Sequence, residues 1–391
     1  MSTAPDPIRL SAAKARALMT SHLGLDSIRL ASGKPGARAL LSKLRCIQLD
    51  PLDTIGTNAD LVAMARVDGL KKSDIYDALL PTHAFEHWAK ERCLLPASAF
   101  PWYRDRMLES SWWRMHDRLK ELPNSVVQAV LEEITRQGPA TSKELSSHGS
   151  VKPVDWSGWK GTSSATTMAL EVLWARCDVV VCGRAGRGKR YDVPQRALPT
   201  TYDKTVALGD EAFLSWMLNE RVEACGLMSR AKGPQWGLLG QAHASSLPDD
   251  LCKAGTLVPI IVEGSSRKYL APKTFLDQTS NAHDGRMRIL APLDPVIWDR
   301  KLVAQIFDFE YIWEVYKPAS KRRWGYYVCP LLHIGDIVGR LEGKVKGDRL
   351  HIDTIWQEDG KAIDLEALDS ALERHAENLG LQGYHRPKRL K

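Results

Sequence analysis

Apolar residues recur every three or four positions in the first third of the chain, a spacing typical of helices with one buried face. The spacing predicts a helix over residues 12–22, with Ser11 as its N-cap, and another over residues 74–80. Between them, residues 36–48 predict a helix that ends where Asp50 precedes a proline. The apolar face of this middle helix consists of Ala37, Leu40, Leu41, Leu44 and Ile47.

Residues 121–200 show three helical patterns followed by two short strands. The helices are predicted over residues 125–136, from Thr141 onward, and over residues 166–176, and the strands over residues 178–182 and 191–193. This order is typical of a winged helix-turn-helix domain. A weaker version follows, with helices over residues 211–223 and 246–254 and strands over residues 256–263 and 267–270.

The last third of the chain has short apolar runs separated by turn residues, which predicts a small barrel or sheet domain. The predicted strands cover residues 288–290, 311–316, 324–328, 336–341 and 350–355. A helix is predicted over residues 365–379, and the basic stretch 385–391 is expected to fray.

The chain has 391 residues, which suits two to four domains, and its 44% of hydrophobic residues are enough for real cores. The net charge of +7 suits a polyanionic partner without proving one. The apolar runs are far shorter than a membrane span requires, and residues 1–8 do not resemble a secretory signal.

Seven cysteines are spread along the chain without a Cys-x-x-Cys pair, so a structural zinc site or an iron–sulfur cluster is not expected. His83 and His87 lie four residues apart, but no third ligand is near them in the sequence. We therefore expect no metal and no cofactor, and we expect reduced thiols, as in a cytoplasmic protein.

One polar residue continues the apolar face of the helix predicted over residues 36–48. This residue is Gln48, whose amide is either hydrogen-bonded in the core or lines a cleft. Asp50 follows in extended chain, where alternate side chains point the same way, so the carboxylate can join the amide. The spacing alone favours a structural role, in which Asp50 caps the next turn and Gln48 satisfies backbone groups.

Two clusters of basic residues are candidate DNA contacts. The first occupies the turn between the strands predicted over residues 178–182 and 191–193, and suits phosphate contact. It consists of Arg184, Arg187, Lys189 and Arg190. The second consists of Lys321, Arg322 and Arg323, followed by Trp324, a combination that fits phosphate contact and base stacking. An ordinary solvated turn explains either cluster about as well.

Several longer segments carry a resemblance to a known family. Residues 46–55 read Cys-Ile-Gln-Leu-Asp-Pro-Leu-Asp-Thr-Ile, and residues 85–96 read Phe-Glu-His-Trp-Ala-Lys-Glu-Arg-Cys-Leu-Leu-Pro. These segments, with residues 290–300, 314–330 and 335–341, resemble the crosslink-repair DNA glycosylases of the YcaQ and AlkZ type. Gln48-Leu49-Asp50 is similar to the catalytic Gln-apolar-Asp of the YcaQ branch.

The resemblance implies an α+β fold in which three tandem winged helix-turn-helix domains and a C-terminal β-barrel-like domain form a C shape. The corresponding parts are residues 1–120 with the catalytic stretch, 121–200 with the basic wing, 201–285, and 286–391 with the last helix and the basic tail.

The resemblance also implies a function. It points to a monofunctional DNA glycosylase that hydrolyses the N-glycosidic bond of cationic alkylated purines of the N7-alkylguanine type, and that unhooks interstrand crosslinks in the YcaQ branch. Gln48 and Asp50 are the expected catalytic residues. The expected partner is double-stranded DNA carrying alkylated purines, bound by a monomer in the cytoplasm at the nucleoid.

The chain departs from the YcaQ branch at two places. Asn58 and Asp60 stand where arginine and histidine are usual, and Lys90 stands where the family segment has histidine. With His87 and Trp88, these residues form the candidate substrate pocket. Two other functions stay open: a self-resistance glycosylase specific for one DNA-alkylating natural product, and a non-catalytic winged-helix transcriptional regulator.

Overall fold

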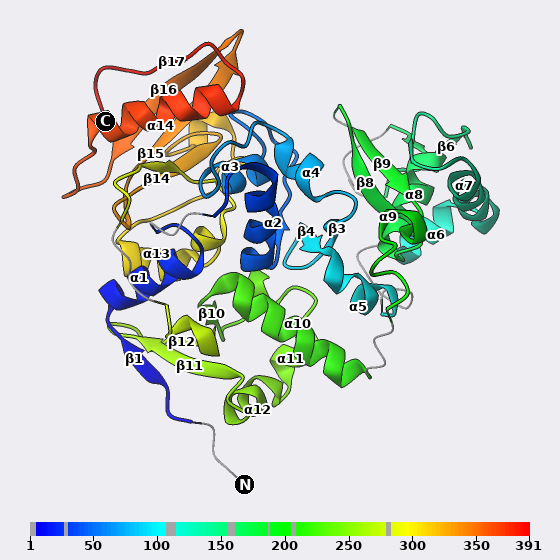
Figure 1. Cartoon of the computed structure of the whole chain (residues 1–391), viewed down its shortest axis with the longest axis horizontal. Coiled ribbons are helices and arrows are strands. Elements are labelled where there is room, and N and C mark those ends of the chain that lie inside the picture. Colours follow the sequence, from blue (N-terminus) through cyan, green and yellow to red (C-terminus); the bar gives the residue numbers. More distant parts are fainter. Residues whose placement is uncertain are drawn as a thin grey trace. The chain divides into compact units, whose positions relative to one another are not determined.

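The computed structural model of the chain describes residues 5–26, 30–106, 115–154, 161–186, 188–204, 209–278 and 283–391 (Figure 1). The chain forms two compact units. Unit 1 comprises Met1–Ile75, Trp88–Cys93 and Asp210–Lys391, and unit 2 comprises Tyr76–His87 and Leu94–Gly209. The division into four domains stays a prediction. No helix among the described residues is long and apolar enough to cross a membrane.

The first helices of the chain follow the predicted pattern closely. The Ser11 hydroxyl caps the first helix by accepting a hydrogen bond from the Lys14 N–H at 3.2 Å. The second helix is shorter than predicted, because Arg45 takes a left-handed conformation with a φ of 60° and ends the helix at Leu44. The four helices are α1 (Ala12–His22), α2 (Gly33–Leu44), α3 (Asn58–Met64) and α4 (Asp74–Leu79).

Unit 1 also contains a four-stranded sheet in the order β1-β11-β12-β10. The predicted hairpin over residues 256–270 forms its centre, and the N-terminal strand β1, which the pattern did not predict, pairs parallel with β11. The strands are β1 (Ile8–Leu10), β10 (Met228–Ser229), β11 (Leu257–Val262) and β12 (Lys268–Pro272). The helices of this part are α10 (Asp210–Cys225), α11 (Gly240–Ala244) and α12 (Leu247–Lys253).

The C-terminal part of unit 1 is a five-stranded sheet, curled as a half-barrel, in the order β13-β14-β15-β16-β17. The central strand β14 is buried along its whole length, and the strands pair antiparallel from β13 to β16. The strands are β13 (Arg288–Ile289), β14 (Val328–His333), β15 (Asp336–Lys346), β16 (Arg349–Gln357) and β17 (Tyr384–His385). The helices are α13 (Arg300–Phe307) and α14 (Leu365–Asn378).

Two strand predictions in this part are wrong. Residues 311–316 form no strand, and residues 324–327 precede β14 instead of belonging to it. The cause is Glu314, whose buried carboxylate accepts hydrogen bonds from the backbone N–H groups of Arg323 at 3.0 Å and Trp324 at 2.7 Å. A backbone donor that binds this carboxylate is not available to a neighbouring strand.

The basic tail does not fray as predicted. The Lys391 N–H donates to the Ile355 carbonyl at 2.9 Å, and the Gln357 N–H donates to the Lys391 carbonyl at 3.0 Å. The Arg386 guanidinium also pairs with Asp369 on α14. The last residues are therefore fixed against the sheet.

Unit 2 contains the first and third helices and the two strands that the pattern predicts for residues 121–200, together with short elements that it did not predict. The predicted middle helix is only a turn, in which the Thr141 N–H donates to the Glu144 carboxylate at 2.7 Å. The helices are α5 (Phe100–Arg104), α6 (Met115–Glu121), α7 (Asn124–Gln137), α8 (Ala165–Ala175) and α9 (Pro194–Ala197). The strands are β5 (Ala140–Thr141), β6 (Ser150–Val151), β7 (Ser163–Ser164), β8 (Val180–Ala185) and β9 (Gly188–Asp192), of which β5, β9 and β8 form a sheet. The count of three winged helices and the C shape stay predictions.

Three further strands belong to the stretch that contains the predicted catalytic and pocket residues. They are β2 (Ile47–Gln48), β3 (Ala84–Trp88) and β4 (Arg92–Pro96). The chain passes between the two units within β3 and β4.

Candidate active site

Gln48 lies in the two-residue strand β2 and not at the end of a helix, so the helical-face argument for it is corrected. It is nevertheless buried, with 6% of its surface exposed. Its backbone carbonyl accepts a hydrogen bond from the Asn58 side chain at 2.8 Å, and the next N–H, of Leu49, donates to the Arg92 carbonyl at 2.8 Å. The strand is therefore held from both sides.

The Gln48 side chain is oriented by a lysine. Its Oε1 accepts a hydrogen bond from the Lys90 ammonium at 3.3 Å. This contact turns the amide oxygen toward the cation, and the Nε2 donor has no partner among the described residues. A donor that is free in this way is suited to bind a water or a substrate atom.

Asp50 is half-buried in the extended chain beyond β2. Its Oδ1 accepts a hydrogen bond from the Leu52 N–H at 2.9 Å, which is the turn-capping contact that the structural interpretation predicts. Oδ2 has no partner among the described residues. Burial raises the pKa of the Asp50 carboxyl, and the Leu52 N–H opposes that rise. The raised pKa increases the carboxylate's affinity for a proton, as a base requires.

Two of the residues that the sequence assigned to the substrate pocket have a structural role, because their side chains bind backbone groups. Asn58 is 1% exposed and joins the Gln48 carbonyl to the Leu293 N–H, which donates to its Oδ1 at 3.0 Å. Asp60, also 1% exposed, forms a capping box with Thr57 at the start of α3 and accepts from the Ser73 N–H at 2.7 Å. The polar atoms of both side chains are taken up by these contacts, so the two residues support the segment that contains Gln48 and Asp50.

The remaining pocket candidates divide between the two units. Lys90 and Trp88 belong to unit 1, where the Lys90 ammonium lies 5.0 Å from the centre of the Trp298 ring. His87 belongs to unit 2, where it is buried and packs against Trp174 with ring centroids 5.0 Å apart. In the structure, His87 is therefore a core residue of unit 2.

The loop after Asp50 is fixed by the C-terminal part of unit 1. The Val345 N–H of β15 donates to the Thr54 carbonyl at 3.0 Å, and His375 Nε2 of α14 donates to the Ile55 carbonyl at 2.7 Å. Burial lowers the pKa of His375 to about 4, so the ring is neutral and donates from Nε2 at neutral pH. The C-terminal part of unit 1 thus fixes the position of the loop after Asp50.

Tyr327 is a site residue that the sequence pattern missed. It is 1% exposed, and its hydroxyl has no hydrogen-bond partner among the described residues. Burial raises the pKa of this phenol, and the negative charge of Asp50 adds to the rise. No spacing signal distinguishes it, because it lies in residues that looked like an ordinary strand.

The basic wing of unit 2 is engaged in contacts of its own. Arg184 and Lys189 both pair with the fully buried carboxylate of Glu86, and Arg190 donates to the Pro139 carbonyl at 2.9 Å. Arg187 lies outside the described residues. The structure therefore gives the described cations of the wing a structural role, and their contact with DNA stays a prediction.

The second basic cluster lies on a rigid loop of unit 1, residues 314–324. Besides its two backbone contacts, the Glu314 carboxylate accepts from the Lys317 ammonium at 2.9 Å, which holds the loop closed. Tyr316, at 87% exposed, protrudes from this loop. Lys321 and Arg323 are exposed, and Arg323 lies over the Trp324 ring at 4.7 Å.

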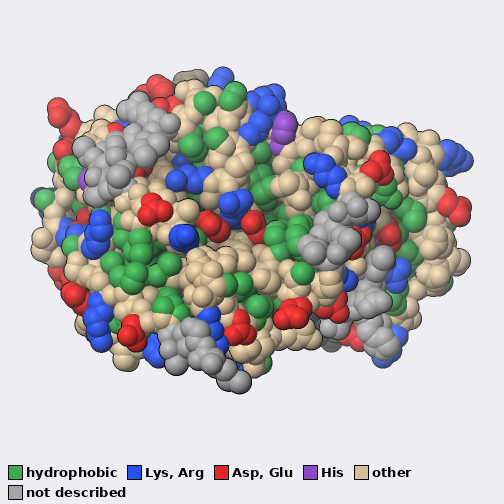
Figure 2. Space-filling view, turned by 60° about the horizontal axis from the view of Figure 1, so that its bottom comes forward, with side chains coloured by type: hydrophobic (Ala, Val, Ile, Leu, Met, Phe, Trp, Pro, Cys, Tyr) green, Lys and Arg blue, Asp and Glu red, His purple; other side chains and the backbone are tan. Residues whose placement is uncertain are grey.

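Charges of both signs are mixed on one face of the molecule. Figure 2 shows basic and acidic side chains interspersed on the face that it draws, so the net charge of +7 is not gathered there. The net charge therefore does not indicate where DNA would bind on this face. The loop of residues 314–324, which is held by Glu314, is a more specific candidate for DNA contact.

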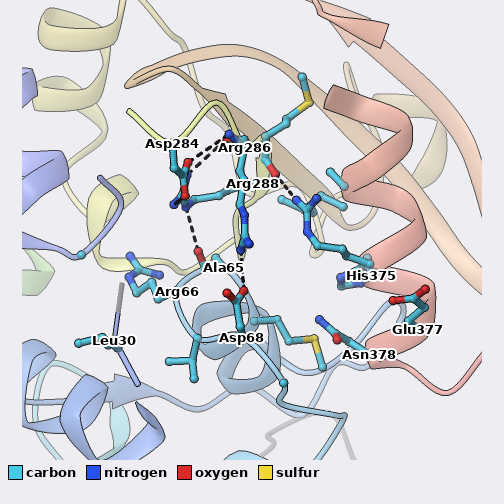
Figure 3. Close-up of a pocket in the computed structure, with 18 of the residues that line it drawn as sticks. Leu30, Ala65, Arg66, Asp68, Asp284, Arg286, Arg288, His375, Glu377 and Asn378 are labelled. Atoms are coloured by element: carbon cyan, nitrogen blue, oxygen red, sulfur yellow. Dashed lines mark hydrogen bonds and ion pairs between the residues drawn. The ribbon is translucent and has the colours of Figure 1, made fainter. Parts of the chain in front are cut away.

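A pocket of about 360 Å³ in unit 1 does not contain Gln48 or Asp50. Its walls carry ion pairs between Arg286 and Asp68 at 2.6 Å and between Arg288 and Asp284 at 2.8 Å (Figure 3). The first pair joins the turn after α3 to the segment before β13, and the Arg374 guanidinium of α14 donates to the Met287 carbonyl at 3.0 Å. His375 also lines the pocket, which therefore lies next to the hydrogen bond that fixes the loop after Asp50.

The described residues contain no group of three side chains placed to hold a metal ion. Comparisons with known proteins bear on the family and on the fold. The family model for AlkZ-like DNA glycosylases matches residues 41–379, which include this stretch and the C-terminal sheet.

One solved structure is similar over nearly the whole chain. It is the Streptomyces sahachiroi DNA glycosylase AlkZ, which matches with a TM-score of 0.62 at 14% sequence identity and covers 97% of this chain and 100% of its own. At this identity the likeness shows the mixed α/β fold. Since the family model covers most of the residues, the chain belongs to the AlkZ-like DNA glycosylase family, whose members are DNA-repair enzymes.

Proposed function

We propose that the enzyme hydrolyses the N-glycosidic bond of cationic alkylated purines, with N7-alkylguanine as the type substrate. The observation that carries this proposal is the half-buried Asp50 carboxylate, which has one unpartnered oxygen two residues from the oriented amide of Gln48. A purine alkylated at N7 already carries a positive charge, so it can leave without an acid. The chemistry that remains is stabilisation of the sugar cation and delivery of water.

Asp50 supplies both of these effects. Its negative charge stabilises the positive charge that develops on the sugar, and Oδ2 accepts the proton of the attacking water. Gln48 positions that water through Nε2, because Lys90 holds Oε1. The proposal thus gives the electrostatic and base roles to Asp50 and the positioning role to Gln48, and the contacts of the two side chains support it.

The test is single-turnover excision from a duplex that contains one 7-methylguanine. Asp50→Asn should slow release of the base by roughly 10²-fold or more, on the scale of electrostatic terms of this kind. The matched control is Asp277→Asn, an exposed carboxylate of unit 1, which should leave the rate unchanged. An unchanged rate in Asp50→Asn would remove the assignment.

The same assay decides the range of substrates. We propose that interstrand crosslinks through N7 of guanine are also unhooked, since each half of such a crosslink is a cationic N7-alkylpurine. A crosslinked duplex should yield separated strands and heat-labile abasic sites. Excision confined to one bulky adduct, with 7-methylguanine left intact, would instead support a self-resistance enzyme.

A further inference from the structure

Lys90 contacts the amide of Gln48, a predicted catalytic residue. Its Nζ donates to Gln48 Oε1 at 3.3 Å and lies 5.0 Å from the centre of the Trp298 ring. Among the described residues, no carboxylate forms an ion pair with Lys90. The backbone at Lys90 is closely packed, since a Cβ added to Gly237 would lie 3.0 Å from the Lys90 carbonyl oxygen.

The surroundings of this amine favour its neutral form. Burial lowers the pKa of Lys90, although the neighbouring Cys93 and Glu91 oppose this effect. A lysine amine that is desolvated in this way can act as a nucleophile toward carbonyl groups. The hydrogen bond to Gln48 keeps this nucleophile beside the position of the sugar.

We propose that Lys90 gives this enzyme a second activity, cleavage of the DNA strand at an abasic site through an imine with the sugar aldehyde. The abasic sugar would bind in the site that we propose for base excision, so this inference rests on the location of the site in the proposed function. It does not require the chain to excise a base, because the substrate is the ring-opened abasic sugar itself.

Each step of this reaction balances without an outside reagent. The Lys90 nitrogen attacks the C1′ aldehyde carbon, and the adduct loses water to form a protonated imine. The Asp50 carboxylate removes a proton from C2′; that electron pair forms the C2′–C3′ double bond, and the C3′–O bond breaks with the phosphate as leaving group. Water then hydrolyses the imine, which returns the amine and leaves an unsaturated aldehyde on one strand end.

The experiment uses the full chain and a duplex with one preformed abasic site. Sodium borohydride reduces the imine to a stable amine, so the wild-type chain should form a covalent complex with the DNA and nick the strand when the reductant is absent. Lys90→Arg keeps the cation and a donor toward Gln48 but cannot form an imine, and should abolish both results. Mass spectrometry of the trapped wild-type complex should find the adduct on Lys90.

The matched control is Lys43→Arg. Burial also lowers the pKa of Lys43, yet this residue belongs to α2 and is not part of the site. Its variant should be trapped as well as the wild type. If Lys90→Arg does not fold by circular dichroism, Lys90→Gln and the position of the adduct in the wild type decide instead.

Two results would overturn the proposal: no trapping of the wild-type chain, or an adduct on another amine. Excision from the 7-methylguanine duplex, measured in parallel, separates this proposal from the proposed function. Trapping at Lys90 without excision would leave the lyase activity standing and remove the glycosylase substrate, and excision without trapping would do the reverse.

Discussion

The Asn58 side chain joins two backbone segments that are far apart in the sequence. Its amide binds the Gln48 carbonyl in a buried hydrogen bond and the Leu293 N–H in a partly buried one. The sequence identified Asn58 as unusual but assigned it to substrate contact, because a sequence pattern does not reveal which polar groups meet across 235 residues. Gln48 and Asp50 came from the same reasoning, and their roles stay predictions until the excision assay is done.

Asn58→Ala should therefore weaken both the fold and the site. It leaves the buried Gln48 carbonyl and the partly buried Leu293 N–H without their side-chain partner, which should lower the free energy of unfolding by about 2 kcal/mol. Urea unfolding followed by circular dichroism measures this change. The control is Asn124→Ala, an exposed amide at the start of α7, which should stay within about 0.5 kcal/mol of the wild type. Equal stabilities for the two variants would contradict the bracing role.

At the scale of elements, the sequence predicts helices and strands that have a regular apolar pattern. It does not predict where a side chain binds the backbone and interrupts a strand. The helix α10 and the hairpin of β11 and β12 match their predictions within a few residues, since their apolar periodicity is determined locally. The region before β14 was assigned two strands, but the buried Glu314 carboxylate takes its backbone donors and makes a loop. Such a contact depends on burial, which the local pattern does not report.

The same loop yields a prediction about DNA binding. Tyr316 is 87% exposed on a loop held by Glu314, so its ring can stack on a base without rearrangement. Tyr316→Ala should weaken binding to a duplex with an abasic site by about 1–3 kcal/mol, the usual contribution of one stacked base. Tyr316→Phe keeps the ring and should bind as the wild type does. Fluorescence anisotropy at one fixed salt concentration measures both, and equal losses would argue against stacking.

At the scale of the molecule, unit 1 depends on contacts between its N-terminal helices and its C-terminal part. The Arg66 guanidinium pairs with Asp294 through two hydrogen bonds of 2.7 and 2.8 Å, and both side chains are fully buried. Arg66 also donates to the Leu23 carbonyl at 2.6 Å and to the Val62 carbonyl at 3.1 Å. These contacts tie α1 and α3 to the segment before α13, and no local sequence signal links residues 66 and 294.

Removing only the cation of this pair should lower the free energy of unfolding far more than removing both charges together. Arg66→Met leaves the Asp294 carboxylate buried without its cation, which should lower the free energy of unfolding by about 3–5 kcal/mol. The double variant Arg66→Met with Asp294→Leu has no uncompensated charge, so it should be more stable than the single variant although it loses the backbone contacts of Arg66. Arg9→Met, at an exposed arginine of β1, is the control and should unfold as the wild type does. Calorimetric melting of the four proteins measures the order, and a double variant no more stable than Arg66→Met would show that the backbone contacts, and not the buried charge pair, hold the two parts of unit 1 together.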